Sequence, residues 1–182
     1  MLVERTGGKS VKPVALAAYQ HLFVEMAQYA IEHASESLDA EARLHSIGKS
    51  VGERLFDVLY LREKGYRRET KLYGILSFIT TFAWKTAFGR SAELHETQDE
   101  YIISDPLFVL NKYASPSPDA SDCLNTGGAF AAGFVEAMVT AAGFPRTVFA
   151  VFVHERPAED WIGTSIVVKK YFCCVLHIIS RL

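Results

Sequence analysis

The hydrophobic period of this chain changes after Gly89, and that change constrains the fold more than any other feature. Before Gly89, apolar residues recur at three- and four-residue steps, which is typical of helices. After Gly89, short segments rich in Val, Ile, Phe and Thr indicate strands. The order is helices, two strands, helices and two more strands. Such segregated elements predict an α+β fold with an antiparallel sheet.

The first half of the chain predicts three helices. The first begins at Pro13, which suits a first helical turn, and ends near residues 35–37. The second spans about 38–64, is the longest expected helix, and carries an apolar stripe along one face. The third spans 71–88 and ends at Gly89, which is expected to act as its C-cap.

The elements expected after Gly89 are shorter. Turn residues and prolines separate them, and residues 115–125 form the longest expected loop. In chain order, they are strands over 92–97 and 100–104, a short helix over 106–110, a helix over 128–142, and strands over 146–155 and 163–172.

Gly48 and Gly52 lie four residues apart and therefore share one face of the second helix. One interpretation is that the helix merely tolerates them, although each costs about 1 kcal/mol relative to alanine. The other is that a second backbone approaches the helix closely at this face. The sequence leaves both interpretations open.

The composition fits one globular domain. The chain has 182 residues, of which 49% are hydrophobic and 22% charged, which is enough apolar material for a core. A net charge of −2 gives no basic footprint for phosphates, so we expect no nucleic-acid partner. Three cysteines, two of them adjacent, fit no disulfide framework and favour a reducing, cytoplasmic compartment.

We expect three segments: a flexible N-terminal arm over 1–12, a single domain over 13–170, and an atypical apolar tail over 171–182. The start of the chain lacks the apolar core of a signal peptide, and no window is apolar enough for a transmembrane helix. In the tail, residues 171–179 are apolar apart from His177. The apolar surplus of the chain predicts large association surfaces.

No motif predicts a catalytic, metal or cofactor site. Cys123 precedes a glycine-rich helix start, which lowers some thiol pKa values, but no histidine pairs with it locally. Cysteines and histidines show no metal-ligand spacing. Residues 125–133 superficially resemble a phosphate loop but lack its Gly-Lys-Ser/Thr, and their glycines and alanines favour tight helix packing. Residues 7–10 are too short for such a motif.

The candidate binding residues lie on the first two helices and in the charged run that follows. Residues 62–71 fit a solvated helix end, and they also fit a patch that faces a partner or an anionic membrane. The candidate partner-binding residues are Phe23, Met26, Val51, Leu55, Arg62, Arg67 and Arg68.

Four stretches together resemble a known family: REKGYRRETK, FAWKTAFGRSAEL, GFVEAMVTAAGFP and GTSIVVKK. They are similar, in the same order, to landmark segments of the small subunits of the TRAPP vesicle-tethering complex, most of all the subunit 5 members. The resemblance covers about residues 7 to 169. It implies a helical layer packed on a four-stranded antiparallel sheet, and a non-catalytic role.

The same resemblance implies an assembly in which small subunits pair through their N-terminal helices. The implied neighbours are subunit 3 and a sedlin-like subunit 2. The assembled complex would exchange nucleotide on a Rab GTPase in endoplasmic reticulum to Golgi transport. It would lie peripherally on cis-Golgi and endoplasmic reticulum membranes.

This chain departs from the family in two respects. Subunit 3 relatives carry a lipidated cysteine that fills an interior channel, whereas this chain has no cysteine before Cys123. The family also continues into a charged helix where this chain has its apolar tail. Two alternatives to the assembly role are a lipid- or small-ligand-binding sensor with an apolar cavity, and an enzyme that uses Cys123.

Overall fold

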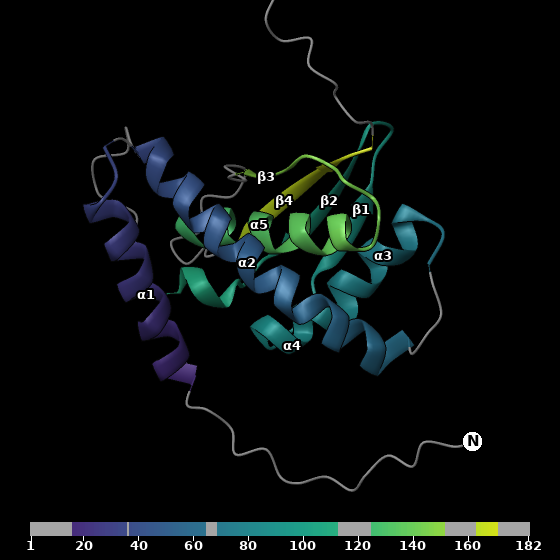
Figure 1. Ribbon diagram of the computed structural model, residues 1–182, viewed down its shortest axis with the longest axis horizontal. Helices are drawn as coiled ribbons and strands as arrows, with labels where there is room; N and C mark the ends of the chain where they lie inside the picture. Colours follow the sequence, from purple (N-terminus) through teal and green to yellow (C-terminus); the bar gives the residue numbers. More distant parts are fainter. Residues whose placement is uncertain (1–15, 36, 65–68, 113–124, 152–162, 171–182) are drawn as a thin grey trace, which may run out of the picture.

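The computed structural model describes residues 16–35, 37–64, 69–112, 125–151 and 163–170. Within them, helices pack on a four-stranded antiparallel sheet, which confirms the predicted α+β fold (Figure 1). The helices are α1 (Leu16–Glu32), α2 (Ser37–Lys64), α3 (Leu72–Phe78), the π-helical turn η1 (Ile79–Ala83), α4 (Trp84–Phe88), the 3₁₀ turn η2 (Val109–Asn111) and α5 (Thr126–Ala141). The strands are β1 (Glu93–Glu96), β2 (Glu100–Asp105), β3 (Val148–Val151) and β4 (Thr164–Lys169).

The strand order of the sheet is β1-β2-β4-β3. Ile103 pairs with Ile166 between β2 and β4, and Val148 pairs with Val168 between β3 and β4. Because side chains alternate along a strand, these four residues lie on the same face. All four are buried, so this face carries the core.

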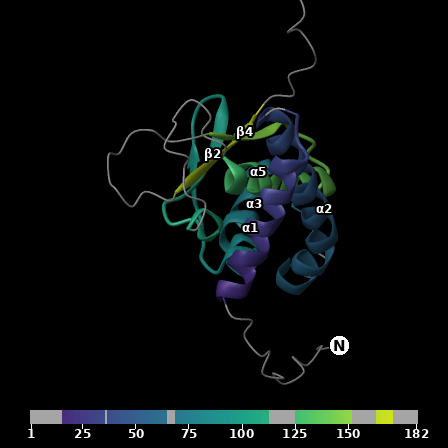
Figure 2. The same ribbon diagram turned by 90° about the vertical axis from the view of Figure 1, so that its left-hand side faces the viewer.

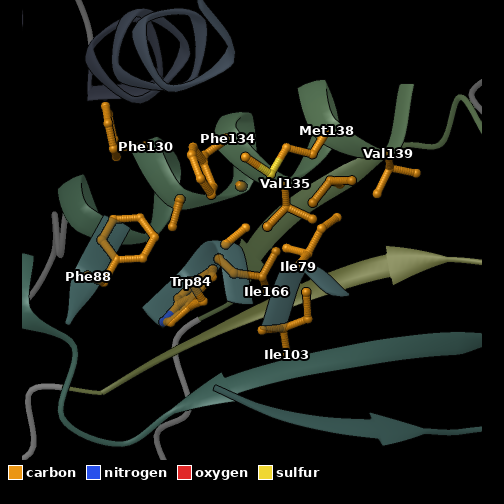
Figure 3. Packing of buried hydrophobic residues seen from close by; sticks show 14 of the residues in the cluster. Ile79, Trp84, Phe88, Ile103, Phe130, Phe134, Val135, Met138, Val139 and Ile166 are labelled. Atoms are coloured by element: carbon orange, nitrogen blue, oxygen red, sulfur yellow. The ribbon is translucent and has the colours of Figure 1, made fainter. Parts of the chain in front are cut away.

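Helix α5 lies between the sheet and α2 and is buried along most of its length. Figure 3 shows Val135 and Met138 of α5 directed toward Ile79, Ile103 and Ile166. A helix that is apolar nearly all round is typical of a central layer. The core of the described chain therefore lies on both sides of α5.

The helix predicted over 71–88 is confirmed as the continuous run of α3, η1 and α4. Gly89 ends it with φ 86°, the left-handed C-cap that was expected. The π-helical turn η1 was not predicted. The carbonyl oxygen of Thr80 within this turn accepts a hydrogen bond from the Ala92 amide at 3.0 Å, so the turn ties the helix to the start of the sheet.

The elements after β2 agree with the predicted types but differ in their bounds. The short helix expected from Pro106 is a 3₁₀ turn that begins at Val109, because Phe108 is extended. Strand β4 contains residues 166–168, as predicted. The rest of the expected third strand, most of the 115–125 loop, the arm over 1–12 and the tail over 171–182 lie outside the described residues.

Candidate docking surface on the first two helices

Helices α1 and α2 meet at one end and separate toward the other, as both ribbon views show (Figures 1 and 2). Helix α2 packs extensively on α5, whereas α1 has far less contact with α2 and also touches η2. The two helices therefore form a hairpin that opens toward the C-terminal end of α2.

Glycines explain how closely α2 and α5 approach each other. A Cβ atom on Gly48 would lie 2.0 Å from the carbonyl oxygen of Phe130, and one on Gly133 would lie 1.9 Å from that of His45. A Cβ atom on Gly52 would lie 2.6 Å from the carbonyl oxygen of Phe134. The structure thus confirms the close-approach interpretation of Gly48 and Gly52, and the tight-packing interpretation of residues 125–133.

An ionic cluster lies beside this crossing. The Glu136 carboxylate on α5 lies 3.0 Å from the Lys49 amine and 3.5 Å from His45 Nε2, both on α2. All three side chains are partly exposed, so each pair contributes modestly to stability. The cluster and the glycines together fix α2 on α5.

The apolar stripe of α2 changes from buried to exposed along the helix. We call the residues at three- and four-residue steps the α2 stripe: Ala40, Leu44, Ile47, Val51, Leu55 and Val58. Leu44 is 0% exposed, the next three residues are half-buried, and Val58 is 46% exposed. Leu61 is also exposed, one turn beyond Val58. We call Val51, Leu55 and Val58 the open half of the stripe.

Helix α1 also has a covered face and a bare flank. Its covered face carries Phe23, whose ring meets Phe130 edge-on with centroids 5.6 Å apart. On the flank, Leu22 is 68% exposed and Tyr29 is 59% exposed. Burial raises the pKa of Tyr19, at the border between the two faces. We call Tyr19, Leu22, Met26 and Tyr29 the α1 flank.

The structure places the predicted binding residues in different environments. Phe23 is a buried core residue of its own chain and is not available on the surface. Met26, Val51 and Leu55 are half-buried against the core, and Arg62 is exposed at the end of α2. Arg67 and Arg68 lie outside the described residues. A docking role for these residues stays a prediction.

Several exposed apolar residues of α1 and α2 were not among the candidates. Leu22 and Tyr29 are seven residues apart on α1, and Val58 continues the spacing of Val51 and Leu55. The spacing of Val58 was visible in the sequence. Its exposure was not, because exposure depends on where α1 lies.

Among the described residues, no group of three or more His, Cys, Asp or Glu side chains gathers to hold a metal ion. No described helix is both long enough and apolar enough to cross a membrane. The exposed apolar side chains on α1 and α2 define the candidate site for interactions.

Comparison with known proteins defines the class to which this chain belongs. Residues 19–169 match the family described as Transport protein particle (TRAPP) component, and the chain belongs to this family. Curated relatives include trafficking protein particle complex subunit 5 of Dictyostelium discoideum, which is 40% identical over 153 residues, or 82% of this chain and 81% of the relative. The human subunit 5 is 39% identical over 155 residues, or 82% of this chain and 80% of the relative.

A solved structure shares the fold at low sequence identity. It is trafficking protein particle complex subunit 3 of Naegleria fowleri, which is covalently bound to palmitic acid. The TM-score is 0.67 at 18% identity, and the match covers 86% of this chain and 96% of that chain. The likeness shows the α+β fold of the family.

Aromatic side chains fill part of the interior between the helices and the sheet. Trp84, Phe88, Phe108 and Phe134 are fully or almost fully buried between the helices and the sheet, and three of them are labelled in Figure 3. The Phe88 ring centroid lies 4.7 Å from that of Trp84, 5.0 Å from Phe108 and 5.5 Å from Phe134. These rings fill the space by contact with one another. No described residue is a cysteine that could carry a thioester.

Proposed function

We propose that this chain is a non-catalytic structural subunit that holds other TRAPP subunits through the open half of the α2 stripe and the α1 flank. The relatives named above are subunits of the trafficking protein particle complex, and the family match covers most of the chain. The proposal adds which surface of the chain would contact the other subunits of the complex.

The observation that carries the proposal is the bare apolar surface on two neighbouring helices. Val58 and Leu61 on α2, and Leu22 and Tyr29 on α1, are each about half exposed or more. Val58 and Leu61 are neighbours on α2, and Leu22 and Tyr29 lie two turns apart on α1. Exposed apolar patches of this kind mark interaction sites. A partner that covers them would gain about 25 cal/mol for each Å² of apolar surface removed from water.

The wider role rests on the family resemblance. Its neighbours in the complex would be small subunits, namely subunit 3 and a sedlin-like subunit 2. The assembled complex would promote nucleotide exchange on a Rab GTPase during endoplasmic reticulum to Golgi transport, while peripherally associated with those membranes. Exchange requires preferential binding of one state of the GTPase, so it demands no acid, base or metal from this chain.

The alternative function, a lipid- or small-ligand-binding sensor, requires an apolar cavity between the helices and the sheet. The contacts among Trp84, Phe88, Phe108 and Phe134 disfavour it, because these side chains occupy that space. A tightly bound lipid in native mass spectrometry of the purified chain would favour the sensor over the assembly role.

Affinity purification of tagged full-length variants tests the proposal. Val58→Asp replaces an apolar side chain of the proposed interface by a charged one that would have to be desolvated, and we expect it to lose the co-purifying TRAPP subunits. Ser46→Asp is the matched control, because Ser46 is exposed on α2 and lies outside the stripe. Thermal denaturation should give the same melting temperature for both variants. Full retention of the partner subunits by Val58→Asp would refute the proposed surface.

A further inference from the structure

Arginines border the open half of the α2 stripe. Arg54 lies three residues after Val51 and four before Val58, and Arg62 lies four residues after Val58. Residues three or four apart on a helix are surface neighbours, so both guanidinium groups stand beside the bare apolar side chains. Both arginines are exposed.

No acidic side chain adjoins the open half along the helix. At three or four residues from Val51, Leu55 and Val58, every neighbour is apolar, glycine or arginine. The nearest acids, Glu53 and Asp57, lie outside this spacing. At helical-neighbour spacing, the charge beside Val51, Leu55 and Val58 is therefore positive only, whereas Asp57 lies at this spacing from Leu61.

The two arginines are not used for internal ion pairs. Among the described residues, the ion pairs involve other side chains, such as Lys49 with Glu136, and neither Arg54 nor Arg62 has an ionic partner. Arginine suits an interface rim, because its planar guanidinium can bind a carboxylate with two hydrogen bonds. Both groups remain available to a carboxylate on another chain.

We propose that the open half of the α2 stripe selects a partner helix that carries carboxylates beside its apolar residues, and that it disfavours a second copy of this chain. A self-paired interface brings the same patch against itself, so the positive rim of one copy faces that of the other. Like charges at an interface oppose binding, whereas complementary charges favour it. The inference rests on the proposed docking function and specifies the chemistry of the partner.

Two helical peptides with the same apolar stripe test the selection. One carries glutamate beside the stripe and the other carries lysine at the same positions, and fluorescence anisotropy measures their binding to the full-length chain. We expect the glutamate peptide to bind roughly tenfold tighter at low salt, because each of the two exposed arginines faces a carboxylate in one complex and a like charge in the other. The difference should shrink as salt screens the charges.

The double variant Arg54→Gln/Arg62→Gln should remove the difference between the peptides without loss of the apolar contact. Equal binding of the two peptides to the unmodified chain, or preference for lysine, would overturn the charge selection while the docking face stands. Binding of neither peptide would overturn the docking face and the selection together.

Self-association gives an independent readout of the same charges. In sedimentation velocity, we expect the isolated chain to associate more at high salt than at low salt, because salt screens the facing arginines. The double glutamine variant should associate at low salt as much as the unmodified chain does at high salt. Self-association of the unmodified chain that falls with salt, or a variant that associates less, would contradict the proposal.

Discussion

The two halves of the α2 stripe have the same side-chain chemistry and different surroundings. In the first half, Ala40 and Leu44 are almost fully buried, because α1 and α5 both lie over this part of the helix. In the second half, exposure rises to 46% at Val58. An apolar helical period thus identifies side chains that are expected to be buried. It does not say whether they are buried within the same chain or by a partner.

The difference arises from where α1 is anchored. The Gln20 side chain donates a hydrogen bond to the carbonyl oxygen of Val109 at 3.2 Å, and Phe23 packs on Phe130 near the start of α5. These contacts hold α1 to η2 and to the N-terminal part of α5. Helix α1 therefore diverges from the C-terminal half of α2, where Val58 and Leu61 are exposed.

The largest expected effect contrasts the two halves directly. Leu44→Ala should destabilise the chain by about 3 kcal/mol, because Leu44 is fully buried and its truncation leaves a cavity in the core. Val58→Ala should change the free energy of unfolding by less than about 0.5 kcal/mol, because its side chain is half exposed in the isolated chain. Urea denaturation measures both values. Similar losses for the two variants would show that Val58 is covered within its own chain.

A second substitution tests whether the α2–α5 contact fixes the position of the stripe. Gly133→Ala would place a methyl group 1.9 Å from the His45 carbonyl oxygen, so the helices must separate. We expect a loss of about 2 kcal/mol in the free energy of unfolding. Gly74→Ala is the control, since its methyl group would meet only the flexible Glu69 side chain, and it should cost less than about 1 kcal/mol. A neutral Gly133→Ala would mean that the helices approach less closely.

A pH-dependent effect should occur in the sheet, far from the stripe. The Lys170 amine donates a hydrogen bond to Glu96 at 2.7 Å and lowers the pKa of that carboxyl below its ordinary 4.5. A lowered carboxyl pKa stabilises the fold fully above its ordinary value, and the contribution is lost as pH falls through the lower value. The stability difference between the unmodified chain and Lys170→Ala should therefore fall in acid by the part due to Glu96, while the bond from Lys170 to the Thr97 carbonyl oxygen and the contact with the Tyr101 ring remain. A difference that does not change with pH would assign the effect to these other contacts.

The smallest expected effect concerns the tail, and it tests the proposed domain boundary after residue 170. Lys170 pairs with the β1–β2 turn through its amide, which donates to the Asp99 carbonyl oxygen at 2.9 Å, so the described fold is tied at this residue. Deletion of residues 173–182 should leave the free energy of unfolding within about 1 kcal/mol and improve solubility. A large fall in melting temperature would move the boundary beyond residue 170.

Local patterns predicted most of the fold. The helical period gave the type and order of the long helices, Gly89 gave a C-cap, and the β-branched run at 166–168 gave the central strand β4. The π-helical turn was not predicted, and the hydrogen bond that the Thr80 carbonyl oxygen within it accepts from the Ala92 amide is not encoded in the helical period. The 3₁₀ turn at 109–111 also depends on tertiary contacts, including the bond from Gln20 to Val109.

The candidate site was predictable only in part. The stripe containing Val51, Leu55 and Val58 followed from spacing, since spacing depends on one helix alone. Phe23 satisfied the same pattern on α1, yet it packs on Phe130 inside the chain. Which apolar residues face solvent depends on the direction of α1 relative to α2. That direction is set by contacts between distant parts of the sequence.

Site-specific photo-crosslinking from position 58 is the most direct test of the central claim that the open half of α2 holds another subunit. A photoreactive amino acid replaces Val58 in the full-length chain within its purified complex, and mass spectrometry identifies the adduct. We predict a crosslink to a helix of another TRAPP subunit, and none from the same amino acid at Ser46 on the solvent side of α2. Crosslinks from position 58 only to its own chain, in a complex that remains assembled, would contradict the account.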